Sequence, residues 1–564
     1  MAKIESNDLN LRDILKDELY YQIPIYQRPY QWTEENCEKL LDDLFFNYED
    51  DRESDYFCGS LVLILIGEDS KKAKTYDIDI VDGQQRLSTF ILLAKVLATL
   101  FLERLTEESK EYLQESLNSR HGKKDRLNFN AIGFNSKKDF QYALTSFNDA
   151  PISNNKNNYL KNAVCLKNYL EKKEIENIDD FIDWLYCNVV FITITCPDAD
   201  KALRIFNVLN ARGLALNATD IFKGELLKKL TEEKEQEELA IRWEDLYQKC
   251  LDNGFAMETL FSQYLVYLDP VTSRKKMDKR LNTQFDKLQK SPLEYLDGVE
   301  DFYNAYVEVL EMPDRYAHLL SYKEDNYWRV ILCTSLLHRY SDQDIKALKE
   351  LLVKFYYQHW VARTKQSQIE QTCCNMIKAL KEKKSMEHIL SIARTNLALY
   401  SVMQHFKENL GDSHVYEKQP TKNPYLKPIL ILVEYFMSDD DCPKCIQMDK
   451  NLHVEHILPQ EPDPSSQWVK DFSEEERELY THSLANLTLL GGKINSQASN
   501  LDFKDKKKIY MGEEIKLNKK KPFKVMTCYK MTIDIAHHYT EWTPKSLEKR
   551  KEELIQKIES MLTL

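Results

Sequence analysis

The pattern of hydrophobic and polar residues divides the chain into a mixed first part and a helical remainder. In roughly the first 225 residues, short apolar runs rich in β-branched residues are bounded by Pro and Gly, as strands are. From about residue 226 to 425, apolar side chains recur at steps of three and four residues, the period of an amphipathic helix. The chain contains only 13 Gly and 16 Pro. We therefore predict an α+β protein that is mostly helical.

Four segments of the first part are predicted to be extended. They are residues 18–30, as a short strand or extended loop, and 55–67, 75–81 and 188–198 as strands. The strand at 75–81 ends in an Asp82-Gly83 turn, and the apolar stretch after the turn is predicted as a buried helix. A helix, a Gly turn and a second helix are predicted over 198–230. At the end of the chain, Thr543 as N-cap and Pro544 as first helical residue predict a last helix.

The chain is too long for one hydrophobic core, because such cores stop growing near about 250 to 300 residues. We predict a first domain over 1–225, a helical connector over 226–424 and a third domain over 425–564. The loop "EKQPTKNPYLKP" marks the last boundary. The apolar faces of the connector are compatible with a homodimer and equally with a monomeric core.

Composition narrows the cellular setting. The first twenty residues lack the apolar stretch of a secretory signal, and the longest apolar runs fall short of the roughly 18 to 20 residues that span a bilayer. We expect a soluble, cytoplasmic protein without a membrane segment, whose cysteines are mostly reduced and buried. The pair in "DDCPKCIQ" is either a turn or half of a zinc site, since structural zinc needs four ligands.

The net charge of −13 argues against a general nucleic-acid coat but not against a local basic groove. Positive charge gathers in "FKDKKKIY", near the end of the chain. We predict that these lysines contact DNA phosphates. The predicted DNA-binding residues are Lys504, Lys506, Lys507 and Lys508.

The stretch "NLHVEHILPQ", residues 451–460, is predicted as a strand that runs into a loop. About thirty residues later, "ANLTLLGGKINSQASN" predicts a second strand, a Gly-Gly turn and the start of a helix. His456 is suited to deprotonate water because an imidazole titrates near neutral pH. Glu455 and Asn495 supply the oxygen ligands that Mg²⁺ or another divalent cation prefers. His453 stays open between a further ligand and a structural residue.

These two segments resemble the His-Me finger (HNH) nuclease motif, in which an acidic-His-Ile-x-Pro strand precedes an Asn-bearing strand and a metal-binding Asn. The resemblance implies a ββα-metal fold, with Asn486 as the catalytic-site residue that holds the loop orienting His456. It implies Asn495 as a metal ligand. The chain departs from the motif by a long insert between the strands and by Glu455 in place of the usual Asp.

A second polar motif, "IVDGQQRLST", lies between a predicted strand and a predicted helix. Backbone N–H groups at a helix start and an Arg side chain both bind phosphate. No P-loop motif is present. The alternative is a buried polar network in which Arg86 pairs with Asp82.

Three companion segments, "IPIYQRPYQW", "YFCGSLVL" and "IFNVLNARGLALNATDIFKG", accompany this motif. Together they resemble the ParB/sulfiredoxin-like N-terminal domain of GmrSD-type restriction endonucleases, in which DGQQR belongs to a site that binds and hydrolyses NTP. The resemblance implies Asp82 as metal ligand or catalytic base and Arg86 on phosphate. The nucleotide-binding residues implied in full are Gln27, Arg28, Asp82, Gly83, Gln84, Gln85, Arg86, Asn210, Gly213 and Lys223, with Asp220 beside them.

The two resemblances occur in one chain in the order of that family. They imply a nucleotide-dependent DNA endonuclease of a bacterial anti-phage restriction system that cuts modified foreign DNA with Mg²⁺. Two alternatives stay open. One is a nucleotide-sensing regulatory protein with a vestigial nuclease domain, and the other is an RNA-cleaving toxin that uses the same groups.

Overall fold

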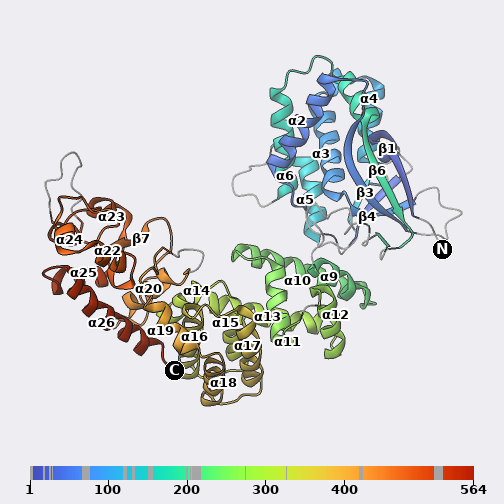
Figure 1. Ribbon diagram of the computed structural model, residues 1–564. Coiled ribbons are helices and arrows are strands. Elements are labelled where there is room, and N and C mark those ends of the chain that lie inside the picture. Colours follow the sequence, from blue (N-terminus) through green and yellow to red (C-terminus); the bar gives the residue numbers. More distant parts are fainter. Residues whose placement is uncertain are drawn as a thin grey trace. The chain divides into compact units, whose positions relative to one another are not determined.

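The computed structural model describes most of the chain as two compact units (Figure 1). Unit 1 comprises Met1–Phe261 and Lys275–Gly298, and unit 2 comprises Ser262–Arg274 and Val299–Leu564. The described residues are 4–564 without 17–18, 25–26, 28–29, 67–75, 119–123, 130–133, 150–156, 199–200, 203–204, 206–217, 274, 326, 418–422 and 514–524.

Unit 1 is built on a mixed sheet of six strands in the order β1-β6-β3-β4-β2-β5. Strand β2 pairs in parallel with β4 and β5, and β3 with β6, whereas β1–β6 and β3–β4 are antiparallel. Hydrophobic side chains line both faces of the central strands, which places these strands inside the unit. The strands are β1 (Glu5–Asn10), β2 (Leu19–Ile23), β3 (Tyr56–Ile66), β4 (Tyr76–Asp82), β5 (Leu127–Phe129) and β6 (Val189–Cys196).

The main core of unit 1 lies between the sheet and its helices. Helices α2, α3 and α6 gather beside the sheet in Figure 1, and residues of all three join the sheet in one buried cluster. Helix α3 is buried along most of its length, as its continuous apolar sequence predicts. The helices of this part are α1 (Leu11–Ile14), α2 (Glu34–Asp50), α3 (Gln84–Leu100), α4 (Glu107–Leu117), α5 (Phe134–Ser146), α6 (Asn158–Lys172) and α7 (Ile178–Asn188).

The remainder of unit 1 and most of unit 2 are helical. Helices α11 and α13 each begin in unit 1 and end in unit 2. The helices are α9 (Ala218–Lys228), α10 (Glu233–Asp252), α11 (Met257–Leu268), α12 (Met277–Leu288), α13 (Pro292–Leu310), α14 (Arg315–Ser321), α15 (Tyr327–Leu337), α16 (Asp342–Val361), α17 (Gln366–Lys381), α18 (Met386–Leu399), α19 (Val402–Leu410) and α20 (Leu426–Phe436).

The end of unit 2 carries a two-stranded antiparallel sheet, β7-β8, surrounded by short helices. Its core gathers aromatic side chains from the insert between the strands, from Phe503 and from Trp542, which lies just before the last helix. The elements are β7 (Leu452–His456), α21 (Gln467–Asp471), α22 (Glu474–Tyr480), β8 (Leu487–Gly491), α23 (Gly492–Ala498), α24 (Phe503–Tyr510), α25 (Lys530–His538) and α26 (Pro544–Leu562).

The predicted fold class, α+β and mostly helical, is confirmed. The structure adds β1 and β5, which the sequence analysis missed because β1 is polar and exposed and β5 has only three residues. Helix α26 begins at Pro544, and the Thr543 side chain accepts a hydrogen bond from Ser546 N, as a cap does. The three-domain division stays a prediction beside the two compact units.

The structure also shows the state of the cysteines and whether any helix could span a membrane. All twelve cysteines are free thiols, and most of them are buried, as predicted. Cys442 is exposed and Cys445 half-buried in irregular backbone after α20. Within the described ranges, no three His, Cys, Asp or Glu side chains are placed to share a metal ion, so no zinc site forms there. None of the described helices is long and apolar enough to cross a membrane.

Candidate functional site

Strands β7 and β8 with helix α23 form a ββα unit that presents the predicted nuclease residues. His453 pairs in register with Leu490 and Glu455 with Thr488, and α23 starts directly after β8. Because side chains alternate along a strand, His453 and Glu455 leave β7 on one face and His456 on the other. The pairing of β7 with β8 and the start of α23 therefore bring the "VEHILP" and "GGKIN" segments together.

Glu455 is held in a buried ion pair with Lys506 of α24. Lys506 Nζ lies 2.6 Å from Glu455 Oε1 and also donates to the backbone carbonyl of His456 at 2.6 Å. Tyr510 donates a hydrogen bond to the same carboxylate oxygen at 3.1 Å. Burial raises the pKa of the Glu455 carboxyl and lowers that of the Lys506 ammonium, and the contact offsets both shifts.

This ion pair corrects the prediction that Lys506 contacts DNA. The side chain of Lys506 is fully buried, so it has no access to a phosphate backbone. The three other predicted lysines differ from it. Lys504 is exposed, Lys507 donates to Tyr539 O at 2.7 Å, and Lys508 pairs with Asp505 at 3.1 Å on a half-exposed surface.

Asn486 holds the loop that follows β7. Its Oδ1 accepts hydrogen bonds from Leu458 N at 2.7 Å and Trp542 Nε1 at 3.1 Å. Its Nδ2 donates to the carbonyls of Leu458 and Thr481 at 2.8 and 2.9 Å. Both the oxygen and the nitrogen of the side-chain amide are thus hydrogen-bonded, and the side chain is fully buried. Asn486 is a positioning residue for the loop rather than a group that reaches a reacting atom.

His456 is 6% exposed at the end of β7. Burial, with His482 and Lys506 nearby, lowers its pKa to about 3, so the ring is neutral near pH 7. Gln460 Nε2 lies 3.3 Å from His456 Nδ1. Because an amide nitrogen only donates, Nδ1 accepts, and the neutral ring carries its proton on Nε2. A turn of the Gln460 amide by 180° reverses this assignment.

Asn495 and His453 lie on or against α23. The Asn495 Oδ1 atom is buried and has no hydrogen-bond partner among the described residues. The Nε2 atom of His453 packs so closely on Gly492 that a Cβ there would lie 3.1 Å from it. Both Lys506 and Tyr510 bind Oε1 of Glu455, which within the described part leaves Oε2 unbonded. An amide oxygen and one carboxylate oxygen are hard donors that suit Mg²⁺, which keeps several waters.

Three residues of this centre were not predicted from the sequence. Gln460 contacts His456 directly, and Tyr416 packs on it although it precedes the predicted third domain. His482 lies next to His456. Tyr416 and His482 are far from His456 in sequence, so their contacts leave no periodic or motif signal, whereas Gln460 belongs to the segment 451–460 itself.

At the N-terminal motif, Gly83 is the N-cap of α3 and adopts φ +95°. A Cβ at Gly83 would lie 2.1 Å from Leu61 Cδ2, so only glycine fits this turn. Because glycine has no side chain, the first N–H groups of α3 receive no cap from it. The turn thus starts α3 without a side-chain cap from its N-cap residue.

Arg86 is turned toward protein carbonyls rather than toward an open phosphate site. Nη1 and Nη2 donate to Cys58 O and Ser60 O, both at 2.8 Å, and Nη2 lies 3.6 Å from Asp82 Oδ2. Gly59, at φ +104°, permits this approach, because a Cβ there would meet Nη1 at 1.8 Å. The structure thus contains the polar network that the sequence left open as the alternative.

The other predicted nucleotide-binding residues are mostly buried or lie outside the described ranges. Gln27 is buried and donates to the carbonyls of Ile80 and Val81, and Gln85 accepts hydrogen bonds from the backbone N–H groups of Gln31 and Trp32. Lys223, which the resemblance implies as a nucleotide-binding residue, is buried, with Glu244 and Asp220 as its charged neighbours. Gln84 is also buried. Arg28, Asn210 and Gly213 lie outside the described residues.

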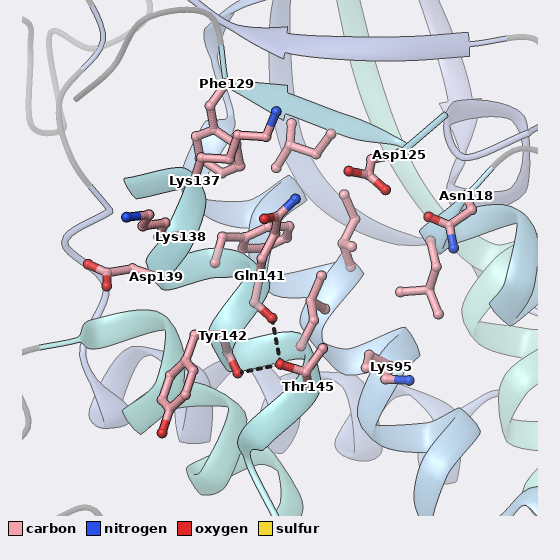
Figure 2. A pocket seen from close by; sticks show the side chains of 15 residues that line it. Lys95, Asn118, Asp125, Phe129, Lys137, Lys138, Asp139, Gln141, Tyr142 and Thr145 are labelled. Carbon is pink, nitrogen blue, oxygen red and sulfur yellow. Dashed lines mark hydrogen bonds between the residues drawn. The ribbon is translucent and has the colours of Figure 1, made fainter. Parts of the chain in front are cut away.

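A cavity of about 740 Å³ lies elsewhere in unit 1, beside α5 (Figure 2). Its lining residues come from α3, α4, β5, α5 and the residues between α4 and β5, and none belongs to Asp82–Arg86. Figure 2 shows Asn118 and Asp125 on one side of it and Lys137 and Lys138 on the other. The cavity is therefore separate from the Asp82–Arg86 motif.

Comparison with known families agrees with both halves of this description. Residues 11–227 match the N-terminal domain of GmrSD restriction endonucleases, and residues 400–557 match the C-terminal domain of the same enzymes. None of the curated proteins matches the chain. Both matched domains are those of restriction endonucleases, which places the chain in this class of DNA-cleaving enzymes. More narrowly, the chain has the two-domain GmrSD architecture and belongs to that family.

Proposed function

We propose that this chain is a nucleotide-dependent endonuclease that cleaves modified foreign DNA at the β7-β8-α23 centre. The observation that carries the proposal is the His456 imidazole, buried and held by an ordered loop, on the same ββα unit as Glu455 and Asn495. Bacterial anti-phage restriction is the role that the family match supports. The homodimer stays a prediction that sedimentation of the purified chain tests.

Each residue of the centre has its own role in the proposed phosphodiester hydrolysis. Asn495 Oδ1 and Glu455 Oε2 would hold a divalent cation, which stabilises negative charge on the phosphate and the leaving oxygen. His456 binds and activates the attacking water. Burial lowers the pKa of His456 to about 3, and an entering phosphate anion raises it by favouring the imidazolium. Asn486 keeps the loop after His456 in place.

The N-terminal unit would bind NTP at the start of α3. Backbone N–H groups of the first helical turn bind phosphate, and the positive end of the helix favours the anion. Arg86 and Gly83 hold the turn in shape, while Asp82, 18% exposed, is the candidate metal ligand or base. Lys504, Lys507 and Lys508 are the remaining candidates for contacts with DNA.

One cleavage experiment tests the nuclease proposal. Modified DNA, unmodified DNA and RNA are each incubated with the full chain and Mg²⁺, with and without each NTP. We expect divalent-dependent cleavage of modified DNA, lost in His456→Ala and retained in His538→Ala, an exposed control histidine. Cleavage by His456→Ala would refute the assignment. Cleavage of RNA but not DNA would favour the RNA-cleaving toxin. If the wild type cleaves neither, the alternative of a vestigial nuclease domain is favoured.

NTP hydrolysis tests the N-terminal proposal separately. Asp82→Asn keeps the shape of the side chain and removes its charge, so we expect hydrolysis to fall while the thermal midpoint stays near that of the wild type. Arg86→Ala removes two hydrogen bonds to backbone carbonyls, so both hydrolysis and stability should fall. Unchanged hydrolysis in both variants would show that the nucleotide site lies elsewhere.

A further inference from the structure

Three aromatic rings pack together beside the nuclease centre. The rings of Tyr416 and His456 are edge to face, with centroids 4.2 Å apart, and His482 lies 5.3 Å from His456 in the same manner. Tyr416 and His482 are stacked at 5.9 Å. Tyr416 N donates to His482 O at 3.1 Å, which ties the two segments together. His482 is thus the imidazole neighbour of His456.

Glu417 binds the far side of His482. Its Oε1 lies 3.4 Å from His482 Nε2, and its Oε2 lies 2.8 Å from His414 Nδ1. A carboxylate at one ring nitrogen keeps the proton on that nitrogen and leaves the lone pair on the other. The neutral His482 ring therefore carries its lone pair on Nδ1.

The two facing imidazoles each have one nitrogen without a partner. Among the described residues, His456 Nε2 and His482 Nδ1 are both buried and make no hydrogen bond. Buried polar atoms almost always have a partner, so the pair calls for a small polar group between or beside the rings. Their roles are complementary, because Nε2 of His456 carries a proton in this arrangement and Nδ1 of His482 carries a lone pair. One water molecule satisfies both, because its oxygen accepts from Nε2–H and one of its O–H groups donates to Nδ1.

We propose that His482 is a second catalytic imidazole, whose Nδ1 binds the same attacking water as Nε2 of His456. Tyr416 and Glu417 are its positioning residues. The proposal rests on the nuclease function proposed above. In the step, one O–H bond of the water breaks and the proton goes to His482 Nδ1 while the water oxygen bonds to phosphorus. The leaving oxygen keeps the electron pair of the broken P–O bond and takes a proton from bulk water.

Steady-state cleavage of modified DNA by the full chain with saturating Mg²⁺ tests this role. For His482→Ala we expect kcat to fall by about 10²- to 10⁴-fold, the usual contribution of acid–base catalysis, with KM nearly unchanged. The double variant with His456→Ala should be no slower than His456→Ala alone, because groups that act as a unit are not additive. His538→Ala, which also removes a histidine paired with a carboxylate, is the matched control and should match the wild type.

Two further variants separate catalysis from support of the fold. His482→Gln keeps an amide near Glu417 but offers no base, so we expect kcat to stay low. Recovery of kcat in this variant would show that His482 only holds its neighbours and would overturn the proposal. Thermal midpoints are measured for every variant, and His482→Asn replaces His482→Ala if the latter does not fold. Near wild-type kcat for His482→Ala or His482→Asn, or full additivity with His456→Ala, would also overturn it.

These outcomes are distinct from failure of the nuclease proposal. If His456→Ala cleaves DNA as fast as the wild type, the centre itself is misplaced, whatever His482 does. If His456→Ala is inactive and His482→Ala is active, the centre is right and the second imidazole is wrong. Glu417→Gln should lower kcat less than His482→Ala, because it disturbs the ring without removing it.

Discussion

Replacing Lys506 by Met should destabilise unit 2 strongly, although the substituted residue belongs to a lysine-rich surface sequence. Lys506 is fully buried and is the only described cation within salt-bridge distance of the Glu455 carboxylate. Met has similar length and fills the same space, so the change isolates the lost charge. At 2.6 Å and an effective dielectric constant of about 20, the pair attracts by about 6 kcal/mol, which desolvation largely offsets.

Removing one partner leaves the other charge buried without compensation. Such losses cost about 3–5 kcal/mol, which for a unit of this size lowers the thermal midpoint by on the order of 10 °C. The hydrogen bond from Lys506 to His456 O is lost as well, so the end of β7 should also become less ordered. Thermal and urea unfolding of the full chain measure the effect. Lys504→Met, on the same helix but exposed, is the matched control and should change stability by less than about 0.5 kcal/mol.

The pH dependence of this loss has a definite sign. Burial raises the pKa of Glu455, and the substitution removes the cation that lowers it. A carboxyl whose pKa is higher in the folded state destabilises the fold as the pH rises above the unfolded value of about 4.3. The difference between Lys506→Met and the wild type should therefore be large at pH 7.5 and shrink towards pH 4.5. Equal stability of the Lys506 and Lys504 variants, with weaker DNA binding only in the former, would refute the reasoning.

Three further predictions concern single positions. Asn486→Ala leaves backbone groups of the loop after β7 unsatisfied, so unfolding free energy should fall by about 2–4 kcal/mol and cleavage should be lost; a change under 1 kcal/mol in chemical denaturation would contradict this. Gly59→Ala collides with Arg86, so NTP hydrolysis and the thermal midpoint should both fall, and an unaffected midpoint would argue against the contact. Gln460→Glu moves the proton of the buried imidazole to Nδ1, so loss of His482 should slow cleavage less in this background; an equal loss would contradict the tautomer assignment.

The sequence predicted well those features that depend on local pattern. Strand β4, the Gly83 turn and the buried helix α3 follow from alternation, a glycine and a continuous apolar run. Helix α26 follows from its cap and its apolar face. The arrangement of β7, β8 and α23 follows from the spacing of the two motifs. Except for the pairing of β7 with β8, the determining interactions are local in sequence.

The partners of charged side chains could not be predicted in the same way. The run "KDKKK" looks uniform in sequence, yet Lys506 lies on the inner face of α24 and Lys504 on the outer one. Helix periodicity separates Lys504 from Lys506, but only the fold shows that Lys506 pairs with the Glu455 carboxylate. Arg86 is similar, because its partners are carbonyls of β3, more than twenty residues earlier.

The ion pair and the three-ring cluster together suggest how the two faces of β7 are divided. On one face, Lys506 and Tyr510 bind one oxygen of Glu455, which fixes the carboxylate and leaves its other oxygen without a hydrogen bond among the described residues. On the other face, Tyr416 encloses His456. Because Tyr416 lies before residue 425, the chemistry of this centre depends on chain that the motifs alone would have excluded, and a fragment beginning at 425 should fold poorly and cleave nothing.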